Sequence, residues 1–250
     1  MLGIVQVFLF LLGLCFGSFC NVMIYRIPRG EEFVKTPSHC MTCGHELKWY
    51  ENIPLFSWLI QKGKCRSCGV ALSPQYPIVE GLNGLVWLLT GLLFRNDLLQ
   101  AILYCCLFTL LMAVAVIDWR TFEIPNGLNL AILILGVVRL CTDLSHWYRY
   151  VIGMCCVSLL FLLIWLITRG GGIGMGDVKL MGAAGLLVGW QNILLGLFAG
   201  CIIGSVVHLW RMKRGAGKKL AFGPYLAVGI WLSALFGEQM LGWYLGLFGF

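Results

Sequence analysis

The stretch Gly170-Gly171-Gly172-Ile173-Gly174-Met175-Gly176-Asp177-Val178-Lys179 joins two long apolar segments and contains a single carboxylate. Asp177 is therefore expected at or just inside a membrane surface, where an ionised side chain is costly and is usually retained for function. Gly174 and Gly176 leave room for another chain to lie against the backbone. The alternative interpretation is a flexible turn in which Asp177 is the N-cap of the next helix. A second carboxylate at the same depth would favour a functional site.

The composition indicates a helical membrane protein. Of the 250 residues, 60% are apolar and only 12% are charged, and the mean hydropathy is +0.87. We expect an all-α polytopic fold of about eight transmembrane helices, in which residues 1–25 are the first helix, 26–76 a cytoplasmic module and 77–250 a helical bundle. The apolar runs of that bundle cover roughly 78–95, 99–117, 127–141, 149–168, 178–190, 191–210 and 222–237. Residues 239–250 have two open placements, as a continuation of the eighth helix or as an interfacial segment.

The positive charges predict the orientation of the chain. The net charge is +7, but the basic residues gather in loops between apolar segments instead of forming a stripe on a soluble domain, so we expect no nucleic acid partner. With the N-terminus outside, the inner segments 26–76, 118–126, 168–179 and 211–219 hold fifteen of the eighteen lysines and arginines. This asymmetry places the polar module and Asp177 on the cytoplasmic side.

Asp118 is the second carboxylate. The apolar run before it is continuous, so it lies at the cytoplasmic end of its helix, where the helix dipole disfavours a negative charge. Two aspartates at matched depth on different helices predict an aspartyl dyad, although two unrelated interfacial residues would give the same pattern. In a dyad, the ionised carboxylate takes a proton from water and the protonated one polarises the scissile carbonyl.

Four further residues are expected to support the substrate cleft. Gly174 and Gly176 would let a substrate strand lie beside Asp177, and Lys179 follows it by two positions. Pro224, in Phe222-Gly223-Pro224, suits a helix start, and irregular backbone at a membrane face can also line a cleft.

Four cysteines predict a structural zinc site. Cys40-x-x-Cys43 and Cys65-x-x-Cys68 are separated by 21 residues, and each pair is followed by glycine. Two such pairs are typical of a closed four-thiolate site, which leaves no position for a catalytic water. A cytoplasmic location disfavours disulfides. His39 and His45 flank the first pair and are alternative ligands.

These motifs together resemble those of the type IV prepilin peptidases, which are bacterial membrane aspartyl proteases of the GxGD type and also N-methyltransferases. The resemblance rests on five segments: Gly17–Pro28, the cysteine module with Gly44–Pro54 and Tyr76–Glu80, Asp118 with Ile124-Pro125-Asn126, Gly174–Lys179, and Phe222–Ala227. Met41 and Gln75 depart from the usual pattern, without touching the dyad or the thiolates.

The resemblance implies a reaction. The substrates would be type IV prepilins or pseudopilins of the inner membrane, cleaved after a glycine at the cytoplasmic face and then methylated on the new N-terminus from S-adenosylmethionine. We predict that Gly17–Pro28, the zinc module and Glu80 help to form the methyl-donor site. Cleavage without methylation remains an alternative, as do a scaffold of pilus assembly and a transporter that relays protons. The substrate set and the oligomeric state stay open.

Overall fold

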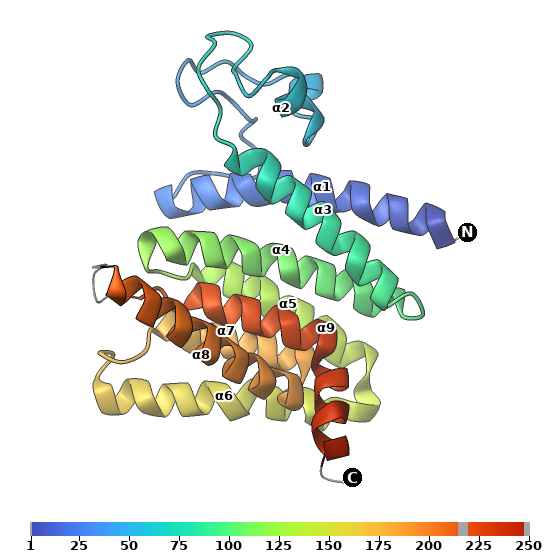
Figure 1. Cartoon of the computed structure of the whole chain (residues 1–250), viewed down its shortest axis with the longest axis vertical. Helices are drawn as coiled ribbons and strands as arrows, with labels where there is room; N and C mark the ends of the chain where they lie inside the picture. Colours follow the sequence, from blue (N-terminus) through green and yellow to red (C-terminus); the bar gives the residue numbers. More distant parts are fainter. Residues whose placement is uncertain (1, 215–219, 248–250) are drawn as a thin grey trace. The chain divides into compact units, whose positions relative to one another are not determined.

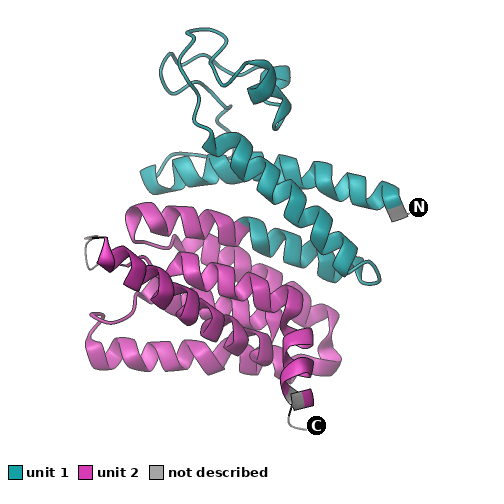
Figure 2. Cartoon of the chain, viewed as in Figure 1, with its two compact units in different colours: residues 1–109 teal, residues 110–250 magenta. Residues whose placement is uncertain are grey.

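The computed structural model describes residues 2–214 and 220–247, and this part of the chain is helical with two isolated β-bridges and no strand (Figure 1). The chain divides into two compact units, residues 1–109 and 110–250 (Figure 2). The boundary falls inside helix α4 (Leu98–Thr121), so each unit holds about half of that helix. The all-α fold class is thereby confirmed.

The first unit is built on α1 (Leu2–Arg26) and α3 (Gln75–Leu93), which pack against each other. Gly13 allows the close approach, because a Cβ there would lie 2.8 Å from Trp87 Cβ and 2.9 Å from Gly84 Cα. The sequence that connects these two helices contains the 3-10 turns η1 (Ile27–Arg29) and η2 (Trp49–Glu51) and the short helix α2 (Phe56–Ile60). Residues 30–74 form a loop-rich module that projects beyond α1 and α3 (Figure 1).

A buried polar network joins the helices of this unit. Asn83 Nδ2 donates to the Gly13 carbonyl at 2.7 Å, and the Thr109 hydroxyl donates to Asn83 Oδ1 at 2.9 Å. Trp87 Nε1 donates to Thr109 Oγ1 at 3.1 Å. Because buried polar groups away from water need partners, these bonds fix the rotation of α1, α3 and the first half of α4.

The second unit continues from α4 with α5 (Asn126–Thr142), the turn η3 (Leu144–His146), α6 (Trp147–Thr168), α7 (Met175–Val188), α8 (Trp190–Lys213) and α9 (Gly223–Leu247). Helix α7 is the core of the unit: apart from Lys179, every residue from Asp177 to Val188 is buried. It packs against α5 and α6, and α8 packs against α9. Small residues allow these contacts, since a Cβ on Gly185 would collide with the Gly153 carbonyl of α6.

The predicted apolar runs correspond to eight long helices. Five helical segments of the described chain are long and apolar enough to cross a membrane, namely Gly3–Arg29, Gln75–Leu93, Leu98–Thr121, Leu144–Thr168 and Trp190–Lys213. Helix α5 is apolar but shorter, and α7 has 14 residues. The number of spans therefore stays a prediction. Helix α9 extends through Leu247, so the last predicted helix continues well past 237; the final positions, 248–250, and the basic residues Lys218 and Lys219 lie outside the described residues.

Candidate functional site

Asp118 lies in the last turn of α4, and its residue exposure is 5%. Its Oδ2 accepts a hydrogen bond of 2.9 Å from the backbone N–H of Gly223, the first residue of α9. The first N–H groups of a helix have no partner within that helix, so they can bind an anionic oxygen. A Cβ at position 223 would stand 2.7 Å from Asp118 Oδ2, which explains why glycine is needed there.

Asp177 lies in the first turn of α7, and its residue exposure is 9%. Its N–H donates to the Gly174 carbonyl at 3.1 Å, and its Oδ1 is buried without a hydrogen-bond partner. Asp177 and Asp118 interact electrostatically, as two acidic groups that repel each other when both are ionised. The second unit thus brings together two buried carboxyl groups from α4 and α7.

The N-cap interpretation of Asp177 is wrong. Gly174 is the N-cap of α7, with an extended backbone at φ −73° and ψ 144°, and Asp177 follows it by three positions. No side chain caps this helix end. The carboxyl group of Asp177 therefore lies within the first turn of the helix, where the backbone N–H of Gly174 interacts with it and its Oδ1 is left without a hydrogen-bond partner.

The start of α5 holds the first turn of α7 in place. Gly176 packs against Ile124, where a Cβ would lie 2.9 Å from Ile124 Cβ. Lys179 Nζ donates to Asn126 Oδ1 at 2.8 Å, and Asn129 Nδ2 donates to the Gly176 carbonyl at 3.4 Å. These contacts join the segment around Ile124-Pro125-Asn126 to the segment that carries Asp177.

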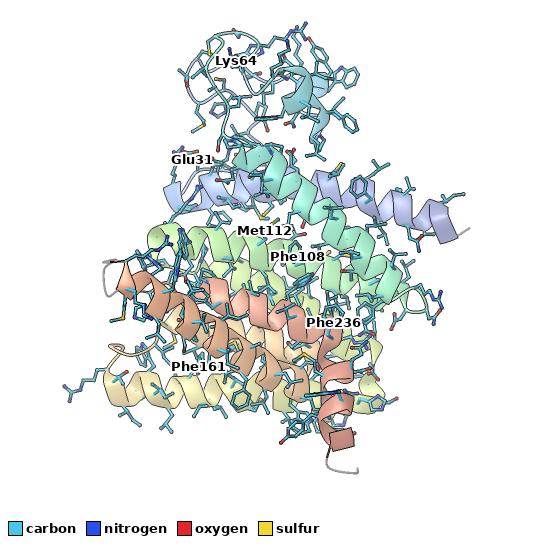
Figure 3. All side chains as sticks on the ribbon, viewed as in Figure 1. Glu31, Lys64, Phe108, Met112, Phe161 and Phe236 are labelled. Carbon is cyan, nitrogen blue, oxygen red and sulfur yellow. The ribbon has the colours of Figure 1, made fainter. Side chains whose placement is uncertain are left out.

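The other predicted support residues lie on the same helix ends. Gly174 is exposed just before α7, and Pro224 is half-buried in the first turn of α9, next to Gly223. The ring of Phe222 lies 6.5 Å from the ring of Phe161 on α6. Phe161 is labelled in Figure 3. Sequence reasoning missed the Gly223 N–H and Asn129. Asn129 had one signal, a polar residue one turn after Asn126 in an otherwise apolar helix.

The first unit brings the four predicted metal ligands together. The Sγ atoms of Cys40, Cys43, Cys65 and Cys68 all lie within 4.8 Å of one another, and those of Cys40 and Cys68 are 3.9 Å apart. Four thiolates at about 2.3 Å from one Zn²⁺ in a tetrahedron require similar sulfur separations, so the residues fit the metal. His39 and His45 do not join this cluster.

Each cysteine pair sits in the same local turn. In the first, the N–H of Gly44 donates to the Cys40 carbonyl at 2.9 Å, and in the second the N–H of Gly69 donates to the Cys65 carbonyl at 2.9 Å. Both glycines have a positive φ, 70° and 73°, which glycine adopts without strain. The backbone N–H groups of Cys43 and Thr42 lower the pKa of the Cys40 thiol to about 6, whereas desolvation and the neighbouring thiols raise the pKa of Cys68, so of the two Cys40 more readily gives the thiolate that binds a metal.

A cavity of about 370 Å³ lies next to this cluster within the first unit, and this volume is within the range of small-molecule sites. Its wall includes Ser18, Asn21, Tyr25 and Arg26 of α1, Cys40 and Cys65, the module residues Glu51 and Trp58, and Tyr76 and Glu80 of α3. Glu80 is buried, and its Oε2 accepts a hydrogen bond of 2.8 Å from the Leu55 N–H. The rings of Tyr25 and Tyr76 stack at 5.5 Å. All three predicted contributors to a methyl-donor site therefore line one cavity.

Two families match the sequence. Residues 11–94 match the family described as Bacterial Peptidase A24 N-terminal domain, and residues 105–209 match the Type IV leader peptidase family. The first match ends just after α3, and the second contains Asp118 and Asp177.

Curated relatives match along nearly the whole chain. The Prepilin leader peptidase/N-methyltransferase of Stutzerimonas stutzeri is 34% identical over 94% of this chain and 91% of its own length. Proteins of the same name are 34% identical in Pseudomonas aeruginosa, covering 96% of this chain and 93% of the relative, and 32% identical in Bacillus subtilis, covering 95% and 96%. No solved structure matches the chain.

Proposed function

The chain belongs to the type IV leader peptidase family, and we propose that Asp118 and Asp177 are the catalytic pair with which it removes the leader from type IV prepilins or pseudopilins. It is an aspartic peptidase with N-methyltransferase activity, and its relatives carry the name Prepilin leader peptidase/N-methyltransferase. The observation that carries the assignment is the meeting of two buried carboxyl groups from different helices in the second unit.

The pair supports peptide hydrolysis. Two carboxyl groups that share one site retain one proton between them, because both cannot carry a negative charge at low cost. The ionised carboxylate takes a proton from the attacking water, and the protonated carboxyl donates a hydrogen bond to the scissile carbonyl oxygen. The Gly223 N–H holds Asp118 in position through its Oδ2. Gly174 and Gly176 leave backbone surface beside Asp177 for an extended substrate segment.

The location supports the same reaction. The chain is a multi-pass protein of the bacterial inner membrane. We place the N-terminus outside and both the zinc module and the dyad at the cytoplasmic face. In this arrangement the chain has about eight spans and three parts: the first helix at 1–25, the zinc module at 26–76 and the helical bundle at 77–250. The supporting observation is the excess of lysine and arginine in the inner segments. A basic leader that remains in the cytoplasm would then present its cleavage site at the depth of the two aspartates.

The first unit is the proposed methyl-transfer unit. Cys40, Cys43, Cys65 and Cys68 would hold a structural Zn²⁺ that closes the module, and Cys40 and Cys65 contribute to the wall of the cavity. S-adenosylmethionine supplies an electrophilic methyl group when bound. Glu80 and the Tyr25–Tyr76 stack would bind and orient it through a buried carboxylate and aromatic surface.

The decisive experiment is cleavage of a purified prepilin in detergent by wild type, Asp118→Asn and Asp177→Asn, with the product mass measured intact. We expect both variants to fold and to lose cleavage. Full cleavage by either variant would remove that residue from the catalytic pair. A wild-type product carrying an added methyl group that depends on S-adenosylmethionine supports the second activity, and an unmethylated product contradicts it.

A further inference from the structure

The cavity of the first unit has a second buried carboxylate, from a different element than Glu80. Glu51 ends the turn η2, and its residue exposure is 6%, the same as that of Glu80 on α3. Both residues line the cavity. Buried carboxylates are uncommon unless a partner compensates their charge, so two on one cavity wall point to a ligand that carries positive charge.

The fold holds Glu51 through one of its two oxygens. Oε2 accepts a hydrogen bond of 3.0 Å from the Lys48 N–H and lies 3.2 Å from His45 Nε2. These bonds, that of the Lys48 N–H above all, lower the pKa of Glu51 and keep it ionised at neutral pH. Among the described contacts, Oε1 has no protein donor and is left for a ligand.

Two basic residues, Arg26 and Arg29, also line the cavity, and each bonds to other groups of the protein and not to Glu51 or Glu80. Arg26 donates to the carbonyls of Glu32, Thr36 and Pro37 at 2.7 to 3.2 Å. Arg29 is half-exposed and pairs with Glu31 at 3.9 Å. Arg66 acts on Glu51 only weakly, since it is exposed and its guanidinium lies over the ring of Tyr50. Zn²⁺ with four thiolates would add further negative charge to the wall that contains Cys40 and Cys65.

We propose that Glu51 makes this cavity selective for a cationic ligand, so that it binds the sulfonium of S-adenosylmethionine in preference to the neutral thioether S-adenosylhomocysteine. The inference rests on the proposed methyl-donor site. The two compounds differ by one methyl group and one positive charge, so a carboxylate that faces the sulfur distinguishes them by electrostatic attraction. The same preference releases the product after transfer, because the product no longer carries the sulfonium charge.

The test is the affinity of the full-length chain in detergent for each compound, measured by isothermal titration calorimetry. We expect the wild type to bind S-adenosylmethionine more tightly. Glu51→Gln should weaken binding of S-adenosylmethionine about tenfold or more, as loss of a charge-assisted contact predicts, and leave S-adenosylhomocysteine nearly unchanged. Glu46→Gln is the matched control, since Glu46 is an exposed glutamate of the same module outside the cavity wall.

The outcomes separate this inference from the function on which it rests. Equal weakening of both compounds by Glu51→Gln, or no weakening, overturns the selectivity role while the donor site stands. A wild type that binds neither compound overturns the donor site and the inference together. Glu51→Asp guards against a folding defect: it keeps the charge, so it should retain the preference for the sulfonium even at lower affinity. Loss of that preference in a zinc-loaded Glu51→Asp chain also contradicts the proposal.

Discussion

Asp118 and Gly223 are 105 positions apart in the chain, yet the N–H of Gly223 at the start of α9 donates a hydrogen bond of 2.9 Å to the Asp118 carboxyl group in the last turn of α4. The contact leaves no space for a side chain at position 223, because a Cβ would lie 3.1 Å from Asp118 Cγ and closer still to Oδ2. The start of α9 is therefore part of the wall around the dyad.

Gly223→Ala should displace the carboxyl group of Asp118 and reduce kcat/KM for prepilin cleavage about a hundredfold, as misplacement of a catalytic group by about 1 Å does. Gly242→Ala is the control on the same helix, since a Cβ there meets no atom within 4 Å. Steady-state cleavage of both variants, with circular dichroism to verify folding, makes the comparison. Equal activity of the two would show that the Gly223 contact does not position Asp118.

Asn129→Leu should lower cleavage more than it lowers stability. The substitution removes the 3.4 Å bond from Nδ2 to the Gly176 carbonyl, next to Asp177. It also removes Oδ1, a buried acceptor without a partner, so the net change in unfolding free energy should stay within about 1 kcal/mol. We expect kcat to fall about tenfold with KM nearly unchanged, because the first turn of α7, which carries Asp177, is no longer held in position. A variant that melts early but cleaves normally would contradict this positioning role.

Removal of the metal should abolish methylation and spare cleavage. The cysteine cluster belongs to the first unit, whereas the contacts of both aspartates described above lie in the second. We expect about one zinc per chain by elemental analysis, since a closed four-thiolate site binds a single ion. Cys40→Ser should lower that content, and Cys141→Ser, which changes an exposed cysteine outside the cluster, should not. Cleavage that disappears together with the metal would show that the two units depend on each other.

Gly17→Ala should impair methylation through the position of Glu80. A Cβ on Gly17 would lie 2.8 Å from Glu80 Cα, and this neighbour is backbone that cannot rotate away. We expect α1 and α3 to separate at a cost of about 1–3 kcal/mol in stability, with weaker binding of S-adenosylmethionine. Gly3→Ala on the same helix is the control, because a Cβ there meets nothing within 4 Å. Thermal melting and ligand titration of both variants make the comparison. A Gly17→Ala chain with the stability and the ligand affinity of wild type would contradict this prediction.

Local signals allowed much of this protein to be predicted. The apolar runs predicted helices, because backbone groups in lipid must bond within their own segment. The cysteine cluster was predictable because each pair closes its own turn around Gly44 or Gly69. Asp118 and Asp177 were noticed because carboxylates are rare in apolar helices, and the structure brings them together.

The contacts that hold these residues were not predictable in the same way. Helices α4 and α7 are apolar on all sides, so their composition does not reveal which face meets which neighbour. The Gly223 N–H, the Asn129 amide and the Glu51 carboxylate become significant only when helix rotation and crossing are known. The sequence by itself determined the helices, the metal ligands and the two aspartates, since each has a local or compositional signature. Only the tertiary structure decided what surrounds them, because contacts between distant segments depend on how close-packed glycines and buried polar bonds orient the helices.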